Sequence, residues 1–110
     1  MALMNMVLLA DYAHARAGDK GNILSVAVFP HDPAHYPWLV RELSAARVAA
    51  QFATRRPSRV HRYELPNLKA LNFVLEDALE GGVNLSCGLD RHGKSLSYLL
   101  LALCLPEPPG

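Results

Sequence analysis

A polar, glycine-containing stretch near the N-terminus, ARAGDKGN at residues 15–22, lies between two short apolar runs. These runs are MVLLADY at residues 6–12 and ILSVAVF at residues 23–29, and the second is rich in β-branched residues. Apolar runs of this length without helix caps are typical of buried strands. The beginning of the chain therefore predicts two strands joined by a loop at residues 15–22.

The length and charge of the chain limit both its architecture and its partners. A chain of 110 residues is long enough for a single domain with one hydrophobic core. Its 11 lysines and arginines nearly balance its 10 aspartates and glutamates, so the formal net charge is +1. Because so small a charge creates no strong overall field, we expect neither nucleic acid nor a membrane surface as a partner.

The ends of the chain and its cysteines indicate the cellular compartment. The N-terminal apolar run has no basic region before it and reaches Asp11 early, and the apolar run at residues 98–105 is far shorter than the roughly 20 residues of a membrane helix. We therefore expect a cytoplasmic protein. Cys87 and Cys104 lie in apolar segments without C-x-x-C spacing, so we expect small buried side chains, with no disulfide, metal site or cofactor.

The middle of the chain predicts a helix followed by a strand. Residues 30–37 contain three prolines and predict a loop, with Pro37 in the first turn of a helix. From Trp38 to Phe52, apolar residues recur every three or four positions, which indicates an amphipathic helix. Residues 60–65, VHRYEL, are typical of a strand that Pro66 ends.

A second helix is predicted after that proline. The apolar residues Leu68, Leu71, Leu75 and Ala78 would share one face of this helix. Asn67 precedes them and is a residue type that favours the N-cap position. The glycines at positions 81 and 82 would then end the helix.

The C-terminal third predicts a return to strands. Residues 83–89 alternate between apolar and polar, and DRHG at 90–93 predicts a hairpin turn. Residues 94–105 fit either a strand throughout or a helical turn followed by a strand, because an unbroken apolar run has no visible period. Residues 105–110 are expected to form a frayed tail.

Together these elements predict an α+β fold. Two helices among short strands favour a two-layer sandwich, with both helices packed on one face of a mostly antiparallel sheet. The other face of the sheet would then be free to meet a partner. The whole chain, residues 1–110, is expected to be one domain.

The stretch from His14 to Asn22 is the first candidate site. Gly18 and Gly21 would let backbone N–H groups approach a ligand, and Lys20 adds a positive charge for a phosphate or carboxylate. Asp19 and Lys20 could serve as a base and as a clamp on a developing oxyanion. The stretch matches neither a Walker loop nor a dinucleotide fingerprint. The alternative is an ordinary hairpin loop in which glycine and aspartate serve the turn.

Other polar residues have simpler interpretations. Asn72 adjoins the apolar stripe, so its amide is either a structural clip or a ligand contact, and Glu64 belongs to the same polar set. His14 borders the glycine loop, where an imidazole can move protons or serve a structural hydrogen bond. His31 and His35 are separated by Pro33, which removes the helix that would aim both at one metal. The basic stretch at residues 55–62 lacks interleaved aromatics and indicates a solvated rim.

Several stretches resemble one known family. ARAGDKGN resembles the A-R-S-G-D-K-G-[DN] signature of the C-terminal ferredoxin-like domain of the acyclic-terpene-utilisation protein AtuA and of its stand-alone small relatives. Later blocks are similar in the same order: HYPWL at residues 35–39, RYELPNLKALNFVL at 62–75, GGV at 81–83 and LDRHGKSL at 89–96. The resemblance covers nearly the whole chain and implies a ferredoxin-like fold.

The resemblance also implies a function. The small domain of this family is either fused behind a larger AtuA domain or encoded separately, which implies that this chain is the small subunit of a two-part assembly. The implied role is in breakdown of branched acyl-CoA compounds in acyclic terpene catabolism, with hydratase- or lyase-like chemistry. Asp19 and Lys20 would be catalytic, and the residues implied to bind an acyl-CoA or carboxylate are His14, Arg16, Gly18, Gly21, Asn22, Asn67 and Asn72.

The chain departs from the family pattern at two places. Ala17 stands where the signature has serine, and Ser25 stands where we expect asparagine, so a polar contact is expected to change there.

Two rival functions follow from the residues. One is a non-enzymatic binding or assembly module, a homo-oligomer whose open sheet face pairs with itself. The other is an independent small enzyme, which is disfavoured because the sequence shows no nucleophile–base pair or metal constellation.

Overall fold

The computed structural model describes residues 5–21, 23–53, 56–77 and 96–109, and for Asp19 it describes the backbone alone. Its strands are β1 (Met6–Leu8), β2 (Ala13–Lys20), β3 (Ile23–Pro30), β4 (Arg59–Leu65), β5 (Ala70–Glu76) and β6 (Cys104–Pro106). Its helices are α1 (Tyr36–Glu42) and α2 (Ala45–Gln51), and residues 96–101 are also helical. Short 3₁₀ turns lie at Leu9–Asp11, Pro33–His35 and Pro66–Leu68.

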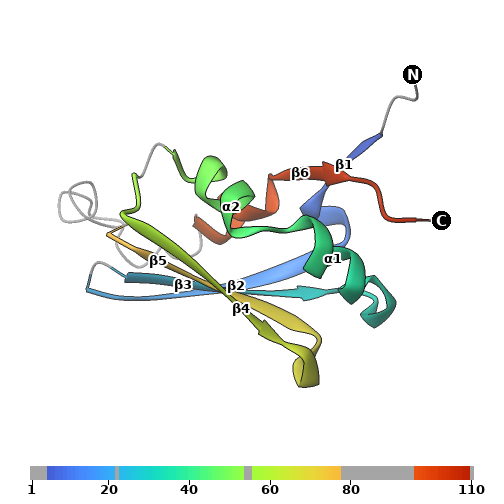
Figure 1. The fold of residues 1–110 in the computed structure, drawn as a ribbon, viewed down its shortest axis with the longest axis horizontal. Helices are drawn as coiled ribbons and strands as arrows, with labels where there is room; N and C mark the ends of the chain where they lie inside the picture. The colour runs from blue at the N-terminus through green and yellow to red at the C-terminus, as the bar shows by residue number, and fades with distance from the viewer. Residues whose placement is uncertain (1–4, 22, 54–55, 78–95, 110) are drawn as a thin grey trace.

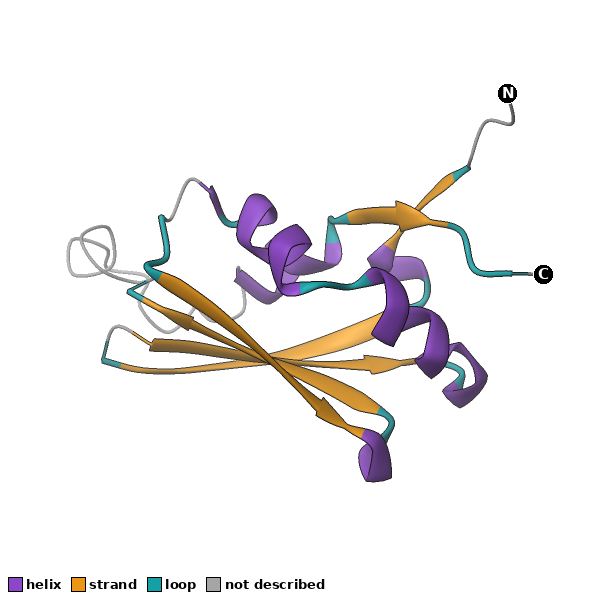
Figure 2. Cartoon of the chain, in the orientation of Figure 1, coloured by secondary structure: helices purple, strands orange, loops and turns teal. Residues whose placement is uncertain are grey.

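Two antiparallel sheets organise the chain. The larger sheet has the strand order β2-β3-β5-β4, and β1 pairs with β6 in a separate two-stranded sheet. Figures 1 and 2 show the described helices on one side of the larger sheet, with the small sheet beside them near the two termini. The predicted two-layer α+β sandwich is therefore confirmed.

The core lies between the larger sheet and the helices. Alternate residues of the two central strands face it, namely Leu24, Val26 and Val28 of β3 and Leu71, Phe73 and Leu75 of β5. The helices contribute Leu39, Val48 and Phe52, among others, and all of these side chains are fully buried. Because side chains of a strand alternate, the intervening residues of β3 and β5 belong to the opposite face of the sheet.

The prediction of a loop at residues 15–22 was wrong for most of its length. β2 continues through Lys20 and pairs with β3 from Ala13↔Pro30 to Lys20↔Ile23. The turn is confined to the end of the hairpin, where Gly21 has a φ of +62°. Polar residues are tolerated in β2 because it is an edge strand with one face turned to solvent. The run at residues 6–12 is likewise not one strand, since β1 ends at Leu8 and a 3₁₀ turn follows.

The second predicted helix was also wrong, because its residues form β5. Leu71 and Leu75 fit a helical stripe, but Phe73 lies between them and completes a period of two. β5 is a central strand that pairs with both β3 and β4, and these ladders decide its conformation. Asn67 makes no cap, and the chain turns instead through a left-handed Lys69 with a φ of 52°.

The first predicted helix is present but divided. Pro37 lies in the first turn of α1, as predicted, and the segment before it contains a 3₁₀ turn at Pro33–His35. The helix stops after Glu42, and α2 begins with Ser44 as its N-cap, where the Ser44 Oγ accepts a hydrogen bond of 3.1 Å from the Arg47 N–H. The strand predicted at residues 60–65 is confirmed as β4, and Pro66 follows its last residue.

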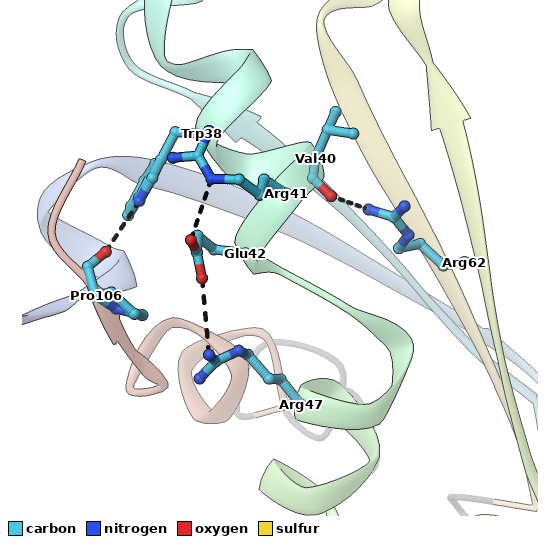
Figure 3. A network of polar contacts seen from close by, with 7 residues as sticks. All are labelled: Trp38, Val40, Arg41, Glu42, Arg47, Arg62 and Pro106. Atoms are coloured by element: carbon cyan, nitrogen blue, oxygen red, sulfur yellow. Dashed lines mark hydrogen bonds and ion pairs between the residues drawn. The ribbon is translucent and has the colours of Figure 1, made fainter. Parts of the chain in front are cut away.

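The C-terminal segment resolves one alternative. Residues 96–101 are helical and β6 follows, so the helical turn before a strand is the arrangement found. Leu105 and Pro106 are buried strand residues, and the predicted tail therefore begins only at Glu107. The buried indole of Trp38 donates a hydrogen bond of 2.9 Å to the Pro106 carbonyl (Figure 3). Cys104 is exposed, contrary to expectation, because Leu103 and Leu105 take the inward positions.

Several predictions cannot be compared with the structure. The glycine stop at 81–82, the strand at 83–89, the turn at 90–93 and Cys87 lie outside the described residues. Within the described part of the chain, no helix is long and apolar enough to cross a membrane.

Candidate functional site

The face of the larger sheet opposite the helices, here called the open face, collects most of the predicted site residues. Strand pairing places one alternate set of residues on it. No described element covers this face (Figures 1 and 2). Its residues include His14, Arg16, Gly18 and Lys20 of β2; Ile23, Ser25, Ala27 and Phe29 of β3; Asn72, Val74 and Glu76 of β5; and Arg59, His61 and Tyr63 of β4.

Unpaired positive charges gather on the open face. Arg16, Lys20 and Arg59 are exposed, and none of them has a polar side-chain partner among the described residues. On β2, Arg16 and Lys20 lie about 13 Å apart along the strand. Gly18 stands between them and carries no side chain, so a ligand could reach the β2 backbone between two long cationic side chains.

Most other described cations are already engaged. Figure 3 shows Arg41 and Arg47 on the two oxygens of Glu42, at 3.2 and 3.7 Å. The Arg62 guanidinium donates to the Val40 carbonyl at 2.9 Å and pairs with Glu64 at 3.0 Å. Arg62 thus connects β4 to α1 on the helix side of the sheet. Arg59 of the same strand lies on the open face and has no such partner among the described residues.

The two glycines of the ARAGDKGN stretch lie in different local structures. A Cβ added at Gly18 would meet nothing within 4 Å, so packing does not require glycine there. Gly21 has a φ of +62°, a conformation that glycine adopts without strain, at the end of the β2–β3 hairpin. Gly21 therefore serves the turn, whereas neither packing nor backbone conformation requires glycine at position 18.

Asn72 lies near the centre of the open face. The Ser25 hydroxyl donates a hydrogen bond of 3.3 Å to the Asn72 Oδ1. Ser25 thus still makes a polar contact at the position where the family pattern has asparagine. The Asn72 Nδ2 has no partner among the described residues, which leaves its N–H donors for a ligand. The Asn72 side chain therefore accepts a structural hydrogen bond through its oxygen, and its amide nitrogen is available as a donor.

Aromatic rings flank the charged positions. On β4, the ring centroids of His61 and Tyr63 lie 6.3 Å apart in a stacked arrangement, and Tyr63 is 51% exposed. On β2, His14 stacks against Phe29 at 5.2 Å and against His31 at 5.7 Å. His61, Tyr63 and Arg59 share the open face but were not among the candidate site residues that the sequence predicted. The alternation within VHRYEL was the available signal, because it puts His61 and Tyr63 on one face and Arg62 on the other.

The structure separates some residues that the sequence grouped. Asn67 is exposed in the turn between β4 and β5, at the end of the sheet far from Gly21. Asn22 lies outside the described residues. The backbone of Asp19 pairs with Leu24, whereas that of Lys20 pairs with Ile23, so Asp19 does not belong to the alternate set of β2 residues that includes Lys20. The described strands thus bring His14, Arg16, Gly18, Lys20 and Asn72 to one face.

No cluster of three or more His, Cys, Asp or Glu residues that could hold a metal ion occurs in the described part of the chain. The absence of a metal or cofactor stays a prediction.

Comparison with known families accounts for nearly the whole chain. The model of the AtuA ferredoxin-like domain matches residues 7–106. The chain belongs to the AtuA ferredoxin-like domain family. Its matched region runs from β1 to the end of β6, so the AtuA ferredoxin-like domain includes both sheets. The ferredoxin-like fold that the sequence predicted is confirmed. No curated protein and no solved structure matches the chain.

Proposed function

We propose that this AtuA ferredoxin-like domain is the small component of a cytoplasmic AtuA-type assembly and binds an acyl-CoA or a related carboxylate on its open face. One observation carries the proposal: Arg16 and Lys20, both in the family signature, are exposed and unpaired on either side of Gly18. Two cations without acidic partners are suited to hold an anion. Arg16 and Lys20 would contact the carboxylate or the thioester oxygen of the ligand.

The chemistry of these groups fits that ligand. Charge-assisted hydrogen bonds from arginine or lysine to a carboxylate or developing oxyanion are stronger than neutral ones. Asn72 adds a neutral donor, because the register connects Arg16 to Ala27 and Ala27 to Asn72 across the strands. Arg16 and Lys20 would hold the acyl group by its oxygen at β2, and Asn72 would donate to the part of the ligand that lies over the centre of the sheet.

The proposed reaction belongs to the breakdown of branched acyl-CoA compounds in acyclic terpene catabolism. Asp19 alternates with Lys20 along the edge strand β2, so it would act from around the strand edge. In a hydration, it would take a proton from water while the water oxygen bonds to the β-carbon of an unsaturated thioester. The electrons of the double bond would move toward the thioester oxygen beside Lys20, and the α-carbon would then take up a proton. The reverse sequence would be a lyase step.

A protein partner is proposed for a different surface. On the small sheet, Met6 is 53% exposed and Leu8 is 44% exposed, and Leu8 is paired with the exposed Cys104. We define these three residues as the apolar ribbon. An apolar surface set apart from a polar ligand face is suited to dock the larger AtuA-type protein while the open face stays accessible.

The test of the open-face site is acyl-CoA binding by the full chain. Lys20→Ala and Arg16→Ala are each expected to weaken binding of an acyl-CoA thioester about tenfold, measured by isothermal titration calorimetry, because each removes a charge-assisted contact. The melting temperature should change by only a few degrees. Lys20→Ala should also abolish turnover by the assembly.

Arg41→Ala is the matched control, because Arg41 is an exposed arginine on α1 rather than on the open face. Equal binding by the Lys20, Arg16 and Arg41 variants would contradict the site. A closed symmetric homo-oligomer that buries the open face and binds no thioester would favour the non-enzymatic assembly module instead.

A further inference from the structure

We propose that the β4 side of the open face is a nucleotide subsite, in which Tyr63 and His61 stack with the adenine ring of coenzyme A and Arg59 contacts its phosphates. This proposal rests on the proposed function, because it takes the open face as an acyl-CoA site with the acyl end over β2. It adds a second half to that site, on residues of β4 that lie outside the ARAGDKGN stretch.

The ring pair on β4 supports the position of the base. Tyr63 and His61 occupy alternate positions of one strand, so both project from the same face. Their rings are stacked, with an interplanar angle of 28°. Nothing described in the chain covers them, and the Tyr63 ring is 51% exposed. Aromatic side chains on an open sheet are platforms on which a planar base can stack, whatever its sequence context.

The charge next to the rings supports the position of the phosphates. Arg59 lies two residues before His61 on the same face, exposed and without a side-chain partner among the described residues. The one carboxylate described on this face, Glu76, is already engaged, since its Oε2 lies 2.8 Å from the His61 Nε2. Glu76 is also the register partner of Arg59. The described side chains of the face therefore have an excess of positive charge, which complements a diphosphate.

The distribution of charge across the sheet favours a long ligand with two polar ends. The described cations of the open face lie only on the edge strands, β2 and β4, which are separated by three strand spacings or about 14 Å. Between them lie the neutral residues Ser25 and Ala27 of β3 and Asn72 and Val74 of β5, with the carboxylate of Glu76 next to Arg59 at one end of β5. The pantetheine arm of coenzyme A is neutral and contains amides, so it can cross this centre and accept a hydrogen bond from the Asn72 Nδ2.

The same distribution disfavours a single-stranded nucleic acid. A strand of nucleotides presents a phosphate at every residue and is bound by cations that follow its whole path. The centre of the open face has none. The observations therefore favour one nucleotide at one edge over a chain of nucleotides across the sheet.

The two halves of coenzyme A provide the test. Adenosine 3′,5′-bisphosphate represents the nucleotide end, and acetyl-pantetheine represents the acyl end. Both are titrated into the full chain, with binding followed by calorimetry and by backbone NMR shifts. Tyr63→Ala and Arg59→Ala are expected to weaken bisphosphate binding about tenfold each, because one removes the ring and the other the charge. Tyr63→Phe keeps the ring and should bind within about twofold of the parent chain.

Matched controls separate the subsite from general surface effects. Tyr98→Ala changes a tyrosine that is 66% exposed but lies in the helical residues 96–101, and it should not alter bisphosphate binding. Arg41→Ala removes an arginine of α1 and should also have no effect. Lys20→Ala should weaken acetyl-pantetheine binding and leave bisphosphate binding within about twofold.

The outcomes distinguish this proposal from the one on which it rests. Bisphosphate affinity that is equal in the parent chain and in Tyr63→Ala would overturn the nucleotide subsite, and a Lys20-dependent response to acetyl-pantetheine would then leave the proposed function intact. Bisphosphate binding that depends on Tyr63, with no response to acetyl-pantetheine, would support the subsite and contradict the acyl end. Tighter binding of an oligoribonucleotide than of the bisphosphate would overturn the subsite in favour of nucleic acid.

Discussion

Single side chains of α1 show how one buried polar group can stabilise this domain while another does not. Trp38 and Tyr36 are both buried in the first turn of the helix. The Trp38 indole donates to the Pro106 carbonyl and so connects α1 to the last strand. The Tyr36 hydroxyl is buried with no hydrogen-bond partner among the described residues. A buried polar group without a partner opposes folding, whereas a paired one is favourable.

These two residues give opposite predictions. Trp38→Phe should lower the free energy of unfolding by about 1–3 kcal/mol, because it removes the donor, leaves the Pro106 carbonyl unpaired and reduces packing. Tyr36→Phe should leave the free energy of unfolding unchanged or raise it by up to about 1 kcal/mol. Denaturant titration of both variants provides the comparison. A loss from Tyr36→Phe as large as that from Trp38→Phe would mean that the tyrosine hydroxyl is paired.

At the scale of elements, local capping and strand pairing decide different parts of the chain. Ser44 starts a new helix in the middle of an apolar periodicity, because its hydroxyl satisfies the Arg47 N–H. Asn67 is also a residue that favours helix caps, but its segment passes through a 3₁₀ turn into β5. The ladders to β3 and β4 provide backbone hydrogen-bond partners on both sides of β5. This segment therefore forms a strand, and Asn67 caps no helix.

A pair of substitutions checks this distinction. Ser44→Ala should lower the free energy of unfolding by about 1 kcal/mol, because α2 loses its N-cap. Asn67→Ala should change it by less than about 0.5 kcal/mol, since Asn67 is exposed and makes no cap bond. Thermal melts followed by circular dichroism give both values. An equal loss in the two variants would show that Asn67 does cap a helix.

At the scale of the whole molecule, the domain presents two surfaces of different chemistry. The open face carries unpaired cations and rings, and the apolar ribbon lies on the small sheet formed by β1 and β6 (Figure 1). The two sheets are separate, and in the described residues the small sheet is connected to α1 through the Trp38–Pro106 bond. The proposed ligand site and the proposed partner surface can therefore be tested by separate mutations.

The partner surface is tested by a charge placed in the apolar ribbon. Leu8→Glu should abolish co-purification of a larger AtuA-type protein from the native host, because it would bury a charge in an apolar contact. Its affinity for acyl-CoA should stay within about twofold of the parent chain, because the open face is unaltered. Leu68→Glu, at a leucine that is 63% exposed in the β4–β5 turn, is the control and should retain the partner. Native mass spectrometry reports each complex.

Local sequence alone predicted the conformation of segments in which one residue type has a strong structural preference. The β-branched run predicted β3, Pro37 predicted the start of α1, and Pro66 predicted the end of β4. The family signature was also readable without a structure, because it is a long run of specific residues, and Arg16, Gly18 and Lys20 of that run stay predicted site residues. These are properties of short segments, and short-range interactions are enough to determine them.

Tertiary structure decided the rest, because pairing between distant segments outweighs weak local preference. ARAGDK became a strand once β3 offered a ladder along its full length, and LNFVL became a central strand once both neighbours were in place. The composition of the open face follows only from the register. A shift of one residue in β4 would move Tyr63 and His61 to the helix side and bring Arg62 to the open face. The sequence by itself therefore determined the family and the signature residues, and the long-range strand pairing determined which side chains join them on one surface.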